Sequence, residues 1–187
     1  KFLATHAKDG PATRELASIL EDAGRFKEAT EVLARLPESD RDAMTLYLMA
    51  KASVGLNRPQ DAIRLMRQAL QKDDSLMVVW ADLASLLEKQ GDIKGAEDCY
   101  RKMEAMGEDS IEIRAKLIRL AIVRKDPIGA MQLLTASKLQ KALLLDAMAA
   151  FLEGKYPKQA KQTLGLLEKI DPTSSDLLFY QAVVAYE

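Results

Sequence analysis

Apolar residues recur along this chain at three- and four-residue intervals, which is the spacing of one face of an α-helix. Between residues 79 and 87, Trp80, Leu83, Ala84 and Leu87 fall at i, i+3, i+4 and i+7. A second run with helical spacing follows Gly91-Asp92 and contains Ile93, Ala96, Cys99, Tyr100 and Met103. The two runs predict two antiparallel helices joined by a few residues, which is a helical hairpin.

This two-helix pattern recurs five times, and a short segment ending in alanine opens each second run. The alanines are spaced 33, 34, 34 and 30 residues apart, at Ala29, Ala62, Ala96, Ala130 and Ala160. A period in this range is typical of stacked helical repeats, in which each hairpin contacts only its neighbours. We therefore expect an all-α solenoid of about five antiparallel helical hairpins.

The segments before these alanines contain residues suited to ending one helix and starting the next. Glycine and asparagine tolerate the left-handed conformation that closes a helix, and they stand at Gly24, Asn57 and Gly91. Proline is favoured at the first position of a helix and occurs at Pro59, Pro127 and Pro157. Aspartates that can cap free N–H groups precede the second helix at Asp92 and Asp126. Each second helix is therefore expected to start at or just after this segment.

The repeat resembles the tetratricopeptide repeat, a helical hairpin of 34 residues. The best match spans 77–110, where the family's signature places hold Trp80, Leu83, Ala84, Leu87, Gly91, Asp92, Ala96 and Tyr100. The resemblance covers nearly the whole chain and implies a right-handed superhelix. It implies one solenoid domain over residues 1–187, with repeats at 10–42, 43–76, 77–110, 111–140 and 141–174. Residues 1–9 are expected to end a preceding helix, and residues 175–187 to form the first helix of a partial sixth repeat.

Charge and hydropathy narrow the class of partner. Lys and Arg number 27 against 28 Asp and Glu, whereas nucleic-acid-binding proteins usually have a basic excess, so we expect no nucleic-acid partner. No apolar run approaches the ~20 residues that span a bilayer, so no membrane insertion is expected within this segment. The chain begins without methionine, and we interpret it as part of a longer protein. A targeting signal could lie outside it, which leaves a cytoplasmic and an exported location both open.

No group of residues predicts catalysis or a cofactor. His6 is the single histidine and Cys99 the single cysteine, and neither has a partner at triad or metal-ligand spacing. The acidic pairs Asp73-Asp74 and Glu108-Asp109 are interpreted as loop and capping residues. We expect a protein that is not an enzyme and needs no cofactor.

In tetratricopeptide-repeat proteins the first helix of each repeat lines a concave groove, so the resemblance implies a set of partner-binding residues. In the first three repeats these are Arg14, Ser18, Tyr47, Lys51, Ala81 and Ser85. In the later repeats they are Arg119, Leu145, Ala149 and Phe179. The same surface would include Val54, Glu88, Ala115, Ile122, Leu152 and Val183. The family's clamp for chaperone C-termini is not reproduced, which disfavours that ligand; its places hold Arg14, Ser18, Leu48, Val78 and Asp82.

These residues predict a protein–protein interaction scaffold that binds a partner peptide or helix in the groove. Lys51 and Arg119 would meet acidic groups of the partner, and the alternative is that both cations are solvated. The apolar residues toward the C-terminus would either contact the partner or pack against further repeats. The alternative function is a structural spacer or a self-association segment of a larger multi-repeat protein. RNA binding by the related 35-residue helical repeats requires a basic groove, and the neutral charge argues against it.

Overall fold

The computed structural model describes residues 10–107 and 110–186, and every regular element in these ranges is a helix. The first helices of five successive hairpins are α2 (Gly10–Asp22), α4 (Ala43–Gly55), α6 (Met77–Lys89), α8 (Ile111–Val123) and α10 (Lys141–Glu153), and one further helix, α12 (Ser175–Tyr186), follows the fifth hairpin. The second helices are α3 (Phe26–Ala34), α5 (Pro59–Lys72), α7 (Ile93–Ala105), α9 (Pro127–Ala136) and α11 (Pro157–Ile170). The prediction of an all-α solenoid of helical hairpins is confirmed. The expectation for residues 1–9 concerns a segment outside the described residues.

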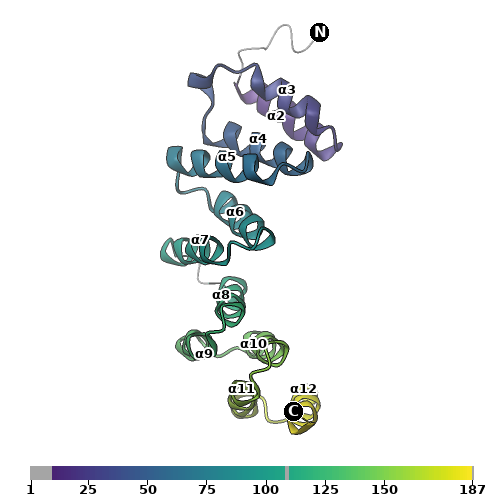
Figure 1. Cartoon of the computed structure of the whole chain (residues 1–187), viewed down its shortest axis with the longest axis vertical. Helices are drawn as coiled ribbons and strands as arrows, with labels where there is room; N and C mark the ends of the chain where they lie inside the picture. The colour runs from purple at the N-terminus through teal and green to yellow at the C-terminus, as the bar shows by residue number, and fades with distance from the viewer. Residues whose placement is uncertain (1–9, 108–109, 187) are drawn as a thin grey trace. The chain divides into compact units, whose positions relative to one another are not determined.

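The chain divides into two compact units, residues 1–99 and residues 100–187, with the division inside α7. Unit 1 contains α2 to α6, and unit 2 contains α8 to α12 (Figure 1). Within the units, α2 packs on α3, α4 on α5, α8 on α9 and α10 on α11. The organisation as one solenoid domain stays a prediction.

One left-handed residue closes the first helix of each hairpin, at the same place in the repeat. The three predicted positions are confirmed, with φ of 71° at Gly24, 57° at Asn57 and 79° at Gly91. Lys125 and Lys155 occupy the equivalent places with φ of 62° and 61°, which the sequence did not indicate. Left-handed backbone costs an L-residue about 1–2 kcal/mol, so the rest of the turn must stabilise these two lysines.

The turn hydrogen bonds are the same in all five hairpins. The N–H of the residue after the left-handed one donates to the carbonyl five positions earlier, as in Asp92 to Leu87 at 2.9 Å and Tyr156 to Phe151 at 2.8 Å. This is the Schellman arrangement, which satisfies carbonyls left free at the end of a helix. The predicted caps are also confirmed, because Asp92 accepts from the N–H of Gly95 and Asp126 from that of Gly129.

Small residues allow the two helices of a hairpin to approach closely in unit 1. The recurring alanines Ala29 and Ala62 are fully buried, and so are Ala17 and Ala50 on the first helices that pack against them. An extra methylene in such a contact typically costs about 1–3 kcal/mol.

Trp80, on α6, is held at its indole, where Nε1–H donates to the carbonyl of Asp74 at 2.8 Å.

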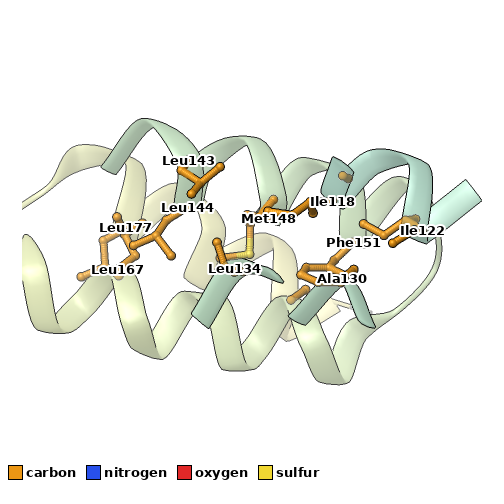
Figure 2. Packing of buried hydrophobic residues seen from close by; sticks show 14 residues of the cluster. Ile118, Ile122, Ala130, Leu134, Leu143, Leu144, Met148, Phe151, Leu167 and Leu177 are labelled. Carbon is orange, nitrogen blue, oxygen red and sulfur yellow. The ribbon is translucent and has the colours of Figure 1, made fainter. Parts of the chain in front are cut away.

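A continuous apolar core runs through unit 2. Phe151, Met148 and Leu144 of α10 are fully buried and belong to one cluster with Ala130 and Leu134 of α9 and Leu167 of α11 (Figure 2). The last helix, α12, joins this core through Leu177, Tyr180 and Val184. An ionic contact supports the same junction, since Lys141 Nζ lies 3.0 Å from Asp171 and 2.9 Å from Asp176.

We expect Gly91→Ala to lower the free energy of unfolding by about 1 kcal/mol, because alanine resists the left-handed φ that this turn needs. A methyl group there would meet no atom within 4 Å, so the effect isolates backbone conformation. Gly165→Ala is the matched control, since its added methyl also meets open space and its position lies inside helix α11. There alanine should instead stabilise by about 1 kcal/mol. Denaturant titrations followed by circular dichroism would check both values, and shifts of the same sign would contradict the assignment.

Candidate partner-binding face

The ten candidate residues occupy two equivalent places on the first helices, four positions apart. We call the surface around these places, in each unit taken by itself, the first-helix face of that unit. Unit 1 carries six of them, namely Arg14, Ser18, Tyr47, Lys51, Ala81 and Ser85. Unit 2 carries the other four, namely Arg119, Leu145, Ala149 and Phe179. Residues four apart lie on one side of a helix, so the pairs on α2, α4, α6 and α10 each project from one side of their helix, while α8 and α12 carry one candidate each.

Lys51 forms an ion pair with an acidic residue of α2, the first helix of the preceding hairpin. Its Nζ lies 3.3 Å from Oε2 of Glu21, whose side chain is only 3% exposed. Neither carboxylate oxygen of Glu21 has a well-formed hydrogen bond among the described residues. Burial raises the pKa of Glu21, and the positive charge of Lys51 only partly opposes this. Lys51 also lies 5.9 Å from the centre of the Tyr47 ring.

Tyr47 is a buried link between helices α4 and α6. Its hydroxyl donates to Oδ2 of Asp82 at 2.6 Å, and the residue is 7% exposed. Burial and this hydrogen bond both raise the pKa of Tyr47, so the hydroxyl stays protonated. Its ring therefore contributes little open surface for a partner.

The remaining candidates of unit 1 are partly accessible. Arg14 donates to Oδ2 of Asp42 at 2.8 Å, which ties α2 to the residue that caps α4. Ser18, Ala81 and Ser85 are half-buried.

The candidates of unit 2 are mainly apolar. Leu145 and Ala149 are half-buried on α10, and Leu145 packs against the core. Phe179 on α12 is 63% exposed, and its ring meets that of Tyr180 edge to face at 5.1 Å between centroids. Arg119 lies 3.4 Å from Oε2 of Glu153, and the two side chains are 44% and 70% exposed.

All three candidate cations thus have a carboxylate within ion-pair distance, from Asp42, Glu21 and Glu153 respectively. None of these three acids was predicted from the sequence to belong to the surface. Glu21 could have been identified from the sequence, because it occupies the same repeat position as Val54 and Glu88, which were predicted to belong to this surface. No comparable signal marks Glu153, which is the last residue of α10.

The described residues contain no group of three or more His, Cys, Asp or Glu side chains that could hold a metal ion. Burial raises the pKa of the Cys99 thiol to about 11, so this side chain stays protonated at neutral pH. His6 and Glu108-Asp109 lie outside the described residues. Within the described part of the chain, no helix is both long and apolar enough to cross a bilayer.

We expect Glu21→Gln to stabilise the protein by about 1 kcal/mol at pH 7, because it removes a buried charge that lacks good hydrogen bonds. Because the pKa of Glu21 is raised in the folded protein, the cost of burying its charge is present above that folded pKa. It disappears as the pH falls below the unfolded value near 4.5. The gain should therefore shrink toward about pH 4, which thermal melts across this range would measure.

Lys51→Met should act in the opposite direction and lose about 1–3 kcal/mol at pH 7, because it leaves the Glu21 carboxylate buried without its cation. Asp22→Asn is the matched control, since it removes an exposed neighbouring carboxylate. A pH-independent effect of Glu21→Gln, or an equal effect of Asp22→Asn, would contradict this account of Glu21.

Comparisons with known proteins identify the repeat. Residues 78–103 match the family model described as tetratricopeptide repeat. No curated protein is similar to the chain in sequence. Among solved structures, the chain is similar to YrrB, described as a TPR protein with an unusual peptide-binding site. The identity is 15%, the TM-score is 0.66, and the match covers 97% of this chain and 96% of that one.

Two further structures give the same result. MamA, from residue 41 to its end, from Desulfovibrio magneticus RS-1 is 15% identical with a TM-score of 0.63, over 88% of this chain and 96% of that one. PilF of Pseudomonas aeruginosa is 16% identical with a TM-score of 0.61, over 100% and 86%. Likeness at these identities shows the fold, and tetratricopeptide repeats generally form non-catalytic scaffolds for interaction with other proteins. Residues 78–103 therefore match a tetratricopeptide repeat, and the chain shares the fold of solved tetratricopeptide-repeat proteins along its length.

Proposed function

We propose that a peptide or helical segment of a partner protein binds to the first-helix face of unit 2. The observation that carries the proposal is Phe179, an aromatic side chain that is 63% exposed at a candidate position. Large aromatic residues supply much of the binding energy at protein interfaces, because they bury a large apolar area at small cost in side-chain entropy. Half-buried Leu145 and Ala149 extend this apolar surface along α10.

The cations Lys51 and Arg119 would bind acidic groups by exchanging one carboxylate for another. Acidic groups of the bound segment would have to displace Glu21 from Lys51 or Glu153 from Arg119. The second exchange is easier, because Glu153 is 70% exposed whereas Glu21 is 3% exposed. Exposed ion pairs contribute only about 0–1 kcal/mol, so Glu153 offers weak competition. We therefore assign the acid-binding role to Arg119 in preference to Lys51.

The first test compares Phe179→Glu with Leu178→Glu. The two side chains are neighbours on α12 with similar exposure, 63% and 70%, but they point in directions about 100° apart. Partners captured from the native extract would be identified, and their dissociation constants measured by calorimetry. Phe179→Glu should weaken binding roughly 30-fold, corresponding to about 2 kcal/mol, while Leu178→Glu should leave it nearly unchanged.

Equal affinities for the wild type and Phe179→Glu would refute this placement of the site. If the wild type captured only itself, and Phe179→Glu abolished that association, the structural or self-association function would replace the proposal. Light scattering over a range of protein concentrations would distinguish this case from binding by a monomer.

The second test addresses the acidic groups of the partner. Glu153→Gln frees Arg119 from its intramolecular competitor, so it should strengthen binding by up to about fivefold, whereas Arg119→Gln should weaken it by a similar factor. The opposite signs distinguish exchange of ion pairs from general loss of charge. Changes of the same sign, or none in either variant, would show that the partner does not bind Arg119 through a carboxylate.

A further inference from the structure

A recess lies on the side of unit 1 formed by the second helices. It has a volume of about 540 Å³ and is bounded by α3, η1 (Glu38–Asp40) and α5, with α4 beneath. We call it the α5 trench. Its floor includes Leu46 and Met49 of α4 and Leu65 of α5. The volume lies within the range of about 300–1,000 Å³ that is typical of ligand pockets.

The two second helices that border the trench differ in length. Helix α3 has 9 residues and ends at Ala34, whereas α5 has 14 and ends at Lys72. The lining extends from Arg58, directly before α5, to Lys72 at its end. At 1.5 Å per residue the trench therefore follows α5 for about 20 Å. Such a length suits a segment of polypeptide better than a compact small molecule.

The charge of the lining is predominantly positive. Four cations, Arg41, Arg58, Arg64 and Lys72, stand against the two carboxylates of Glu38 and Asp61. Arg41 donates to the carbonyls of Leu36 and Ala34, and Lys72 donates to the carbonyl of Arg41. These neutral acceptors hold the two cations in position, and Lys72 also interacts with the nearby carboxylate of Asp42.

Arg64 and Asp61 form the one ion pair between lining residues that the described contacts contain, at 3.6 Å with both side chains more than half exposed. An exposed pair of this kind contributes little, so an incoming carboxylate can replace Asp61 at modest cost. Arg58 stands at the entrance near the start of α5.

We propose that the α5 trench docks an acidic segment of a partner protein. Carboxylates of the segment pair with Arg58 and Arg64 on the rim, and an apolar side chain packs on Met49 and Leu46 of the floor. Complementary charge selects the partner and speeds its association, while the apolar floor adds contact area. This surface is distinct from the first-helix face of unit 2 and does not depend on the function proposed for that face.

The experiment selects binders of the wild-type protein from a random 16-residue peptide library, then measures their dissociation constants by fluorescence anisotropy. The trench variant is Arg58→Gln/Arg64→Gln. The matched control is Lys27→Gln/Arg67→Gln, which removes two exposed cations from α3 and α5 that do not line the recess. Phe179→Glu serves as a second control, because it alters only the first-helix face of unit 2. Circular dichroism verifies that each variant is folded.

Enriched peptides should be rich in Asp and Glu and contain apolar residues. Their dissociation constants should rise about tenfold or more in the trench variant, and stay within about twofold in Lys27→Gln/Arg67→Gln and in Phe179→Glu. Absence of enriched peptides, or enrichment of peptides without acidic excess, would overturn the proposal. Equal losses in the trench variant and its charge-matched control would reduce it to nonspecific attraction. Loss only in Phe179→Glu would overturn it while supporting the first-helix face of unit 2. Competition by single-stranded RNA as strong as by the peptides would exclude a protein-specific site.

Discussion

The architecture of this protein depends on one left-handed residue that ends the first helix of each hairpin. Its conformation brings the following N–H back to the carbonyl five positions earlier, and the chain reverses within a few residues. The reversal sets the second helix beside the first, where paired alanines such as Ala17 and Ala29 permit close contact. Neither helix is long enough to be stable alone, so packing across this contact is what makes the sequence helical.

These turns could be predicted from the sequence where the residue type itself favours the backbone conformation of the turn. Glycine and asparagine tolerate positive φ, and proline and aspartate start helices, so Gly24, Asn57, Gly91 and their neighbours were recognisable. Lys125 and Lys155 were not, because lysine has no preference for the left-handed region. Their conformation is imposed by the hydrogen bonds and packing of the hairpin, and such tertiary effects leave no mark on a single residue type.

The candidate surface was predictable in its position and not in its interactions. Repeat register assigned Lys51 and Arg119 to the first helices, since equivalent residues of equivalent helices share a face. The acids that contact them come from neighbouring repeats, at places set by how closely adjacent first helices approach. Assigning a cation to a groove from its position in the repeat alone therefore describes the binding site incompletely. Its availability depends on the exposure and stability of the residue already beside it.

The hydrogen-bonded indole of Trp80 has a consequence for observing this molecule unfold. It is the chain's single tryptophan and lies in unit 1, so its fluorescence reports the order of that unit alone. Circular dichroism sums the helices of both units. Repeat proteins contact mainly their nearest neighbours, which allows one part to melt before another. The separation between the two optical transitions would therefore measure how independently the two units unfold.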